Sequence, residues 1–114
     1  MSEFVTLCEN RDFRRAYQRG RSFVSPILVT YVIKNKNNNL RIGITTSKKI
    51  GKAVERNRSR RVIRAALREI SEKIKPGYDL VFVARGKTPF VKSTSILSAM
   101  KKQLSEAGIL ENFQ

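Results

Sequence analysis

The sequence predicts an α/β fold of the α+β sandwich type, in which helices pack on one mixed sheet. Three β-rich segments and three helical segments follow one another in the order α-β-β-α-β-α. The chain has 114 residues, the usual size of one domain, and its 40% hydrophobic content is enough to build a core. We find no repeat and no linker, so we expect a single domain over residues 1–114.

The first half of the chain is expected to form one helix and two strands. A helix from about Arg11 to Arg19 would have Asn10 as its N-cap and would end at a glycine. Ile27–Ile33 is rich in β-branched residues and predicts a long strand. Apolar residues alternate with others in Leu40–Thr46, beyond a polar turn. We expect the two strands to pair as an antiparallel hairpin.

The second half of the chain predicts two helices around one strand. A helix is expected from about Lys52 to Lys73, because a proline and a glycine then stop it. Tyr78–Ala84 is apolar almost throughout and predicts a buried strand. A last helix from about Thr94 to Ala107 would place its apolar residues on one face.

The composition excludes several kinds of site. Cys8 is the only cysteine and there is no histidine, which rules out an internal disulfide, a Cys/His zinc site and a histidine-assisted nucleophile. The nine carboxylates include no close pair of the kind that holds Mg²⁺ in a two-metal nuclease. We therefore expect no catalytic residue and no metal ligand in the protein itself. Without a signal-peptide pattern or an apolar run of about 20 residues, we expect a cytoplasmic protein.

Positive charge is concentrated in one segment. The net charge is +15, and nine Lys and Arg residues lie between Lys48 and Arg68, where Glu55 is the only acid. This segment therefore carries +8. Such a density of like charge repels itself unless a polyanion neutralises it, and nucleic acid does so with release of counterions.

The basic segment has two faces when it is drawn as a helix. At about 100° per residue, one stripe holds Asn57, Arg60, Arg61, Arg64 and Arg68, with Arg56 and Arg58 flanking it. The opposite face is apolar and would pack on the sheet. Lys48 and Lys49 extend the positive surface before the helix. An anionic membrane is the main alternative partner, but it would require exposed apolar residues beside the charges.

Three aromatic residues suggest that the nucleic acid is single-stranded RNA. Phe13 and Tyr17 are spaced i, i+4 on the first helix, and Tyr31 lies mid-strand, so the three rings could line one groove. They could equally be core residues, above all Phe13. No helix-turn-helix, zipper or zinc finger surrounds the basic helix to indicate DNA binding.

The basic segment closely resembles the RNR signature of the bacterial ribonuclease P protein subunit. The resemblance rests on Arg56-Asn57-Arg58-Ser-Arg60-Arg61 with its lead-in from Ser47, and it covers roughly residues 8 to 107. Asp12–Gly20 is similar to the first helix of that family, Arg41–Ser47 to its second strand and Gly77–Arg85 to its third. The family fold, shared with the second domain of a small-subunit ribosomal protein, has a left-handed β-α-β crossover. Handedness statistics alone would favour the right-handed form.

The resemblance implies a protein that assists a ribozyme. In that family an RNA subunit removes the 5′ leader of precursor tRNA, with Mg²⁺ held mainly by the RNA. The positions that match the contacts to the RNA subunit are Lys48, Lys49, Arg56, Asn57, Arg58, Arg60, Arg61, Arg64 and Arg68. The positions that match the cleft for the single-stranded leader are Phe13, Tyr17, Val29 and Tyr31.

Three other functions remain open at this point. A general RNA-binding module would explain the charge and the rings, but not the ordered match along the chain. A self-sufficient nuclease disagrees with the residue inventory. A DNA-binding regulator would prefer duplex DNA to structured RNA.

Overall fold

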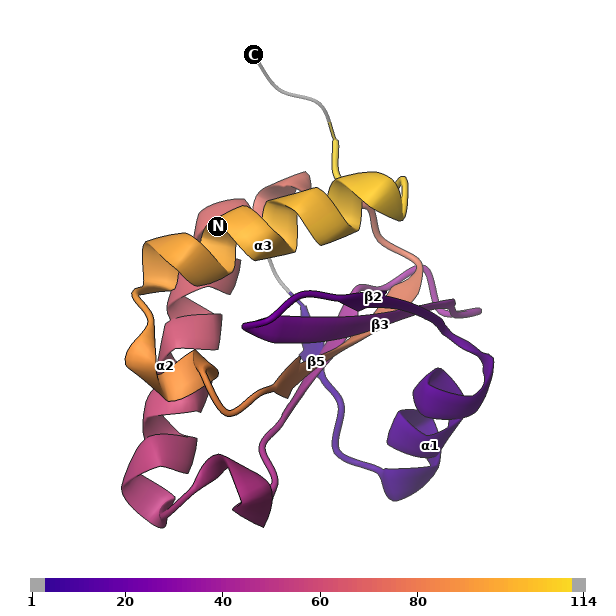
Figure 1. The fold of residues 1–114 in the computed structure, drawn as a ribbon. Coiled ribbons are helices and arrows are strands. Elements are labelled where there is room, and N and C mark those ends of the chain that lie inside the picture. Colours follow the sequence, from indigo (N-terminus) through magenta and orange to yellow (C-terminus); the bar gives the residue numbers. More distant parts are fainter. Residues whose placement is uncertain (1–3, 112–114) are drawn as a thin grey trace.

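The computed structural model describes residues 4–111 of the chain, which form one five-stranded sheet with helices on both faces (Figure 1). The α-helices are α1 (Asn10–Arg19), α2 (Ala53–Ile70) and α3 (Ser93–Glu106). The strands are β1 (Val5–Thr6), β2 (Arg21–Val24), β3 (Leu28–Lys34), β4 (Arg41–Thr45) and β5 (Tyr78–Ala84). Short 3₁₀ helices are η1 (Lys48–Ile50), η2 (Ser71–Lys73) and η3 (Thr88–Phe90).

The sheet is mixed, and β5 occupies its centre. The strand order is β1-β4-β5-β3-β2, in which β4 and β5 are parallel, as are β1 and β4, while the other pairs are antiparallel. Leu80, Val81 and Phe82 of β5 have no solvent exposure. The predictions of a mixed sheet and of a buried strand at Tyr78–Ala84 are confirmed.

The predicted antiparallel hairpin between Ile27–Ile33 and Leu40–Thr46 is wrong. β3 and β4 do not pair, because β5 lies between them and places Phe82 opposite both Thr30 and Ile44. The reason is burial: β5 is apolar on both faces, so it is most stable where both of its edges are hydrogen-bonded and both faces are covered. β5, although distant in the sequence, therefore takes the place beside β3 that β4 would have had in a hairpin.

The sheet has a different hairpin, formed by β3 with a strand that the sequence reasoning missed. β2 pairs with β3 through a turn in which Ser25 N–H donates to Leu28 O at 2.9 Å. The hydroxyl of Ser25 accepts a hydrogen bond from Leu28 N–H at 3.1 Å. The signal was the alternation in Arg21–Val24 followed by the Ser-Pro turn. β1 was missed as well, since two residues are too short for a pattern.

α2 and α3 cover one face of the sheet and bury the main core (Figure 1). From α2, the buried apolar residues are Ile63, Ala66, Leu67 and Ile70. Within this core Thr30 donates its hydroxyl hydrogen to Gln103 Oε1 at 2.6 Å, so both buried polar groups are satisfied. The predicted helix to Lys73 covers α2 and the short η2 turn that follows it.

α1 lies on the other face of the sheet, over a second and smaller core. Leu7, Ala16 and Val81 are buried there, with Phe13 and Tyr31 packed against them. α2 connects the adjacent parallel strands β4 and β5, so the expected β-α-β crossover is present, while its handedness stays a prediction. Within residues 4–111, every helix is too short or too polar to cross a membrane.

Candidate nucleic-acid interface

The outer face of α2 carries a row of basic side chains. Its inner face is buried through Ile63, Ala66 and Leu67 in the main core, which holds the helix in a fixed rotation. The outward side chains form what we call the arginine face, and they are Asn57, Arg58, Arg61, Arg64 and Arg68. The same helix therefore anchors itself by its apolar residues and presents its cations to solvent.

The four arginines of this face also line a groove. They border a hollow of about 590 Å³ whose far wall includes Ser93, the first residue of α3. In the part of the chain that the structure describes, no carboxylate lies within ion-pair distance of any of them. Their charge is thus uncompensated within this region, which suits a polyanionic partner.

Arg56 and Arg60 are half-buried at the edge of α2 and make contacts within the protein. Arg56 Nη1 donates to the carbonyl oxygen of Gly51 at 2.7 Å, which ties the helix start to the preceding loop. Arg60 Nη1 donates to Asn57 Oδ1 at 3.3 Å. The helical wheel placed Arg60 within the stripe and Arg58 beside it, but in the structure Arg58 is exposed and lines the groove, while Arg60 is half-buried at the edge. Part of the hydrogen-bonding capacity of Arg56 and Arg60 serves the fold.

The single acid of the basic segment caps the helix. Glu55 Oε1 accepts a hydrogen bond from the backbone N–H of Lys52 at 3.0 Å. A carboxylate in the first turn of a helix satisfies a free N–H and opposes the positive end of the helix dipole. Glu55 therefore stabilises the start of α2 and leaves the arginine face positive.

Lys48 and Lys49 lie in η1, three to four residues beyond the end of β4. Both are exposed, and the hydroxyl of Ser47 accepts a hydrogen bond from Lys49 N–H at 3.3 Å. This turn continues from Thr45 at the sheet to the start of α2. The two lysines thus extend the basic surface of α2 toward the end of β4.

The four residues matched to the leader cleft lie together on the α1 side of the sheet. The rings of Tyr17 and Tyr31 meet edge to face, with centroids 5.0 Å apart and planes at 75°. Val29 is on the same face as Tyr31, two residues away along β3. Phe13 packs in the smaller core, with its ring against Gly43 of β4. Tyr17, 42% exposed, is therefore accessible to a ligand, whereas Phe13 has mainly a packing role.

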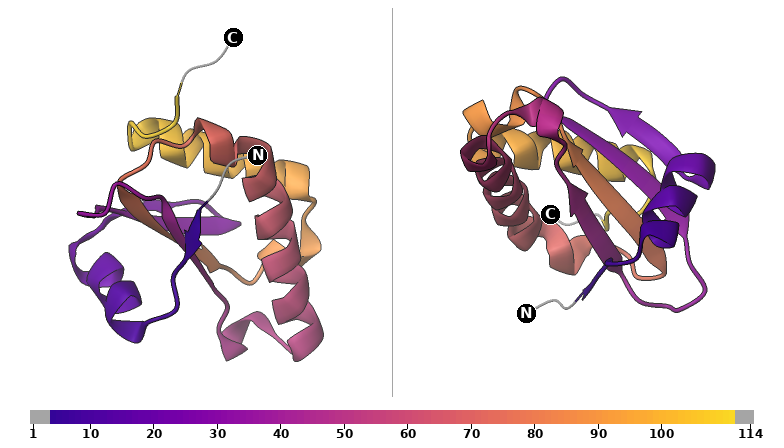
Figure 2. Two further views of the ribbon diagram at one scale, coloured as in Figure 1. Left: turned by 180° about the vertical axis from the view of Figure 1, so that it is seen from behind. Right: turned by 90° about the horizontal axis from the view of Figure 1, so that it is seen from below.

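Three further residues share this face and were missed by the sequence reasoning. Val29 is opposite Val24 on β2 and Val83 on β5, and Val83 is in turn opposite Thr45 on β4. Together we call Tyr17, Val24, Val29, Tyr31, Thr45 and Val83 the open sheet face. α1 and α2 lie at opposite sides of the sheet in the view from below (Figure 2, right). Only the strand order reveals this set, since its members come from five elements.

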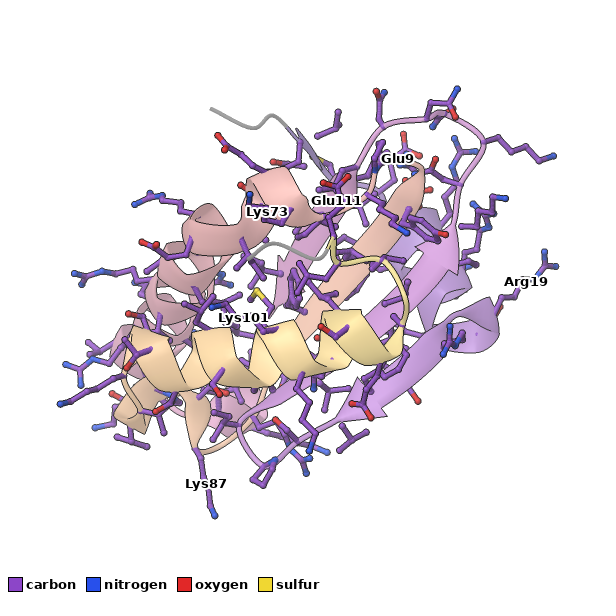
Figure 3. The ribbon with its side chains drawn as sticks, turned by 90° about the horizontal axis from the view of Figure 1, so that it is seen from above. Glu9, Arg19, Lys73, Lys87, Lys101 and Glu111 are labelled. Atoms are coloured by element: carbon purple, nitrogen blue, oxygen red, sulfur yellow. The ribbon has the colours of Figure 1, made fainter. Side chains whose placement is uncertain are left out.

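A second group of basic residues lies on α1. The helix carries Arg11, Arg14, Arg15 and Arg19, of which Arg19 extends away from the body of the molecule (Figure 3). Arg15 Nη2 donates to the carbonyl oxygen of Lys34 at 3.3 Å. Four arginines within ten residues could have predicted a second basic helix from the sequence. The sequence reasoning considered only the denser charge of α2. α1 is therefore a second basic element, on the opposite face of the sheet from α2.

The most buried carboxylate belongs to a structural ion pair. Asp79 accepts two hydrogen bonds from Arg41, at 2.7 Å from Nε and 2.6 Å from Nη2, and one from Asn35 Nδ2 at 2.8 Å. The two residues meet because the parallel register of β4 and β5 places Arg41 opposite Asp79. Burial alone would raise the pKa of Asp79, but these hydrogen bonds and the charge of Arg41 outweigh it and lower the pKa.

Sequence comparison places these features in a family. The family model described as Ribonuclease P matches residues 1–108. The ribonuclease P protein component of Clostridioides difficile is 55% identical over 80 residues, which cover 69% of this chain and 70% of that protein. This chain belongs to the ribonuclease P protein family. The component from Clostridium botulinum strain Langeland is 43% identical over 102 residues, covering 89% and 92% of the two chains.

Solved structures of ribonuclease P proteins have the same fold. The protein from Staphylococcus aureus matches with a TM-score of 0.82 and 29% identity, covering 96% of this chain and 100% of that one. The protein from Thermotoga maritima matches with a TM-score of 0.77 and 28% identity, covering 89% and 96%. The predicted α+β fold of the ribonuclease P protein is confirmed.

Membership of the ribonuclease P protein family decides between the functions that composition left open. The chain is a protein component of an endoribonuclease and has an RNA partner within a ribonucleoprotein. Its role is in tRNA processing, as the resemblance implied. The DNA-binding and membrane-binding alternatives are thereby replaced by RNA binding.

Proposed function

We propose that this protein binds two RNAs with two different surfaces. The arginine face, together with Lys48 and Lys49, binds the catalytic RNA subunit of ribonuclease P. The open sheet face binds the single-stranded 5′ leader of precursor tRNA. The observation that carries the proposal is the arginine face itself, with four arginines on one helix and no carboxylate of residues 4–111 within ion-pair distance of them.

The arginine face supports RNA binding for an electrostatic reason. A helix that is fixed by its buried side holds its guanidinium groups at set positions, so little side-chain freedom is lost on contact. Each phosphate that is neutralised releases counterions, and six cations on this surface would give a salt slope on the order of −4 to −5. The same charge reduces repulsion between RNA segments, which lowers the Mg²⁺ concentration that the ribozyme requires.

The open sheet face supports leader binding for a geometric reason. Tyr17 presents an exposed ring against which a base can stack, and Val24, 66% exposed, continues the apolar surface across the sheet. Stacking on an aromatic side chain contributes about 1–3 kcal/mol per base and does not depend on which base is present. Exposed cations on neighbouring elements, Lys48 in η1 and Arg14 on α1, can contact the phosphates of the same strand.

Binding of the leader gives the protein a role in catalysis without a catalytic residue. The leader is present on the precursor and absent from mature tRNA, so contacts to it raise affinity for the substrate and are lost with the product. This difference in affinity favours binding of substrate and release of product. We place this activity in the cytoplasm, with tRNA precursors as the substrates.

The carboxylates of residues 4–111 do not fit a Mg²⁺ site. Asp79 and Asp12 are held by Arg41, Glu55 caps a helix, and Glu9 pairs with Arg11 at 2.7 Å. No cluster of three potential ligands occurs in the described range 4–111. We therefore assign the Mg²⁺ of the reaction to the RNA and derive no step of the chemistry from this chain.

The test is cleavage of a 5′-extended precursor tRNA at low Mg²⁺ with a bacterial ribonuclease P RNA. We expect cleavage at the mature 5′ end when RNA and protein are both present, and little with either alone. Tight RNA binding without any gain in cleavage would replace the proposal by general RNA binding. Cleavage by the protein without the RNA subunit would mean that the chain has an active site of its own.

A further inference from the structure

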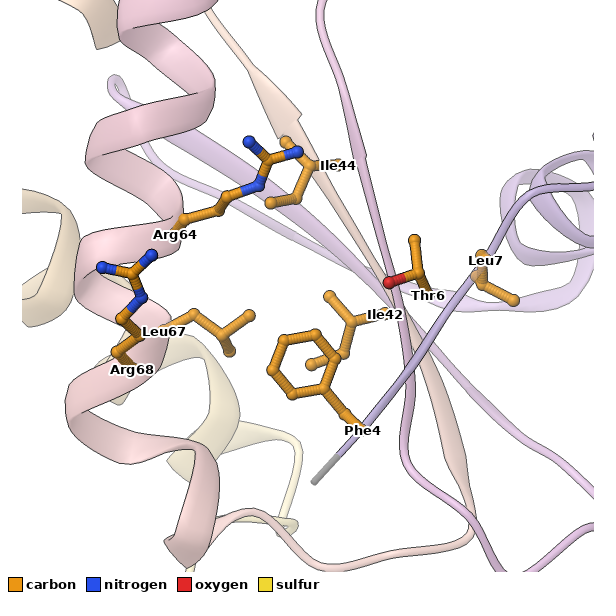
Figure 4. Close-up of a pocket in the computed structure, with 8 residues that line it drawn as sticks. All are labelled: Phe4, Thr6, Leu7, Ile42, Ile44, Arg64, Leu67 and Arg68. Carbon is orange, nitrogen blue, oxygen red and sulfur yellow. The ribbon is translucent and has the colours of Figure 1, made fainter. Parts of the chain in front are cut away.

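A pocket lies between the N-terminal strand, β4 and α2, beside the arginine face (Figure 4). Its volume is about 260 Å³. The residues that line it are Phe4, Thr6, Leu7, Ile42, Ile44, Arg64, Leu67 and Arg68. Six of the eight belong to β4, α2 or β1, and the remaining two flank β1 at Phe4 and Leu7, so the pocket exists only because β1 joins the sheet beside β4.

The pocket has an apolar floor and a cationic rim. Ile42 and Leu67 are almost fully buried, while Phe4 is 38% exposed and directs its ring toward Leu67 (Figure 4). Arg64 extends from α2 toward the sheet on the opposite side of the pocket, and Arg68 lies one turn further along the same helix. A matching ligand has a flat apolar part and an anionic part a few ångströms away.

The size of the pocket favours one ring system. Sites for drug-sized ligands have volumes of about 300–1,000 Å³, and this pocket is slightly smaller. A single nucleotide matches this description. Its base is flat and can stack on Phe4, and its phosphate is separated from the base by one sugar. A base pair within a duplex could not enter, because its faces are covered by its neighbours.

We propose that this pocket holds the base of one unpaired nucleotide of the partner RNA, with an adjacent phosphate on Arg64 and Arg68. The inference rests on the proposed function, because it requires RNA on the arginine face. It adds a pocket for an inserted base to a surface whose RNA binding is otherwise explained by charge alone. Two cations with no carboxylate partner among residues 4–111, next to an exposed ring, provide the complementarity for such a nucleotide. The stacking part of this contact is independent of salt, unlike the phosphate part.

The absence of tryptophan from the sequence makes a direct test possible. Phe4→Trp places a sole tryptophan in the pocket, and Phe90→Trp places one on η3, where Phe90 is 72% exposed and lines no part of the pocket. Each variant is titrated with adenosine 5′-monophosphate and with ribose 5-phosphate, which has the anion without the base. Circular dichroism verifies that both variants are folded.

We expect adenosine 5′-monophosphate to quench the fluorescence of Trp at residue 4, and ribose 5-phosphate to leave it unchanged. Equal quenching at residue 90 would mean unspecific stacking and would overturn the inference. Equal quenching of Trp at residue 4 by ribose 5-phosphate would reduce the pocket to an anion site and also overturn the inference. The mononucleotide titration shows whether the pocket binds a base, and its result does not depend on whether the protein supports cleavage of precursor tRNA.

A second measurement tests whether the pocket binds a base of the RNA as well as a free nucleotide. Phe4→Ala should weaken binding to ribonuclease P RNA about five- to thirtyfold, with the salt slope unchanged, and Phe90→Ala should have no effect. Wild-type affinity for the RNA together with an unaltered Phe4→Ala affinity would exclude insertion of an RNA base. Failure of the wild-type protein to bind this RNA would instead contradict the proposed function.

Discussion

The ring of Phe13 lies so close to the backbone of Gly43 that a β-carbon on residue 43 would come within 2.5 Å of the ring atom Cε1. The same β-carbon would lie 3.2 Å from Cβ of Leu7. The lack of a side chain at Gly43 therefore lets the ring of Phe13 on α1 pack directly against β4. This contact sets the position of the helix that carries Tyr17.

Gly43→Ala should lower the free energy of unfolding by about 1–3 kcal/mol, because the added methyl group overpacks the contact with Phe13. Gly86→Ala is the control, since a β-carbon there meets no atom within 4 Å. Chemical denaturation of both variants measures the difference. If Phe13→Leu does not partly restore the stability of Gly43→Ala, the loss does not come from this ring.

Tyr17→Ala should weaken binding of precursor tRNA to the holoenzyme about five- to thirtyfold, while binding of mature tRNA stays the same. The reason is that, in the proposed function, the exposed ring contacts only the leader. Tyr17→Phe keeps the ring and should bind like the wild type. Equal losses for precursor and mature tRNA would contradict the assignment of the open sheet face to the leader.

Arg61→Gln and Arg64→Gln should each weaken binding to the RNA subunit and make its salt slope about 0.7–0.9 less steep. Lys87→Gln is the matched control, because Lys87 extends into solvent away from α2 (Figure 3). Filter binding over a range of salt concentrations gives the slopes. The same slope for Arg61→Gln as for the wild type would mean that this arginine meets no phosphate.

Asp79→Asn should lower the free energy of unfolding by about 2–4 kcal/mol, because it removes the closer of the two charged partners of Arg41 in a mostly buried site. Asp12→Asn should cost less, since its contact to Arg41 is longer, at 3.4 Å. Thermal or chemical unfolding at neutral pH compares the two. A larger loss for Asp12→Asn would contradict this order.

The same ion pair predicts the direction of a pH dependence. The pKa of Asp79 is lower in the folded than in the unfolded protein, so its contribution is complete above the unfolded pKa of about 3.9. That contribution is lost as the pH falls through the folded value. Stability should therefore decrease below about pH 4, and less so in Asp79→Asn. An identical acid transition in both proteins would exclude Asp79 as a cause.

Local patterns in the sequence were sufficient for the helices and for three strands. The amphipathic pattern of α2 assigns Ile63 and Leu67 to the core and Arg61 and Arg64 to solvent, because helical geometry relates residues three and four positions apart. The continuous apolar run of Tyr78–Ala84 likewise required burial on both faces. These features depend on neighbours in the chain, and a single sequence contains them.

The tertiary structure decided which distant residues meet. β5 separates β3 from β4 because burial of both its faces outweighs the pairing of sequence neighbours, and this order brings Thr45 and Val83 beside Val29. Arg41 meets Asp79 for the same reason, and Phe4 reaches Leu67 only because β1 adds to the edge of the sheet. The sequence by itself determined that the chain has a basic helix, an apolar buried strand and an RNA partner. Which side chains form the open sheet face and the pocket depends on packing between distant segments, and no periodicity within a segment contains that information.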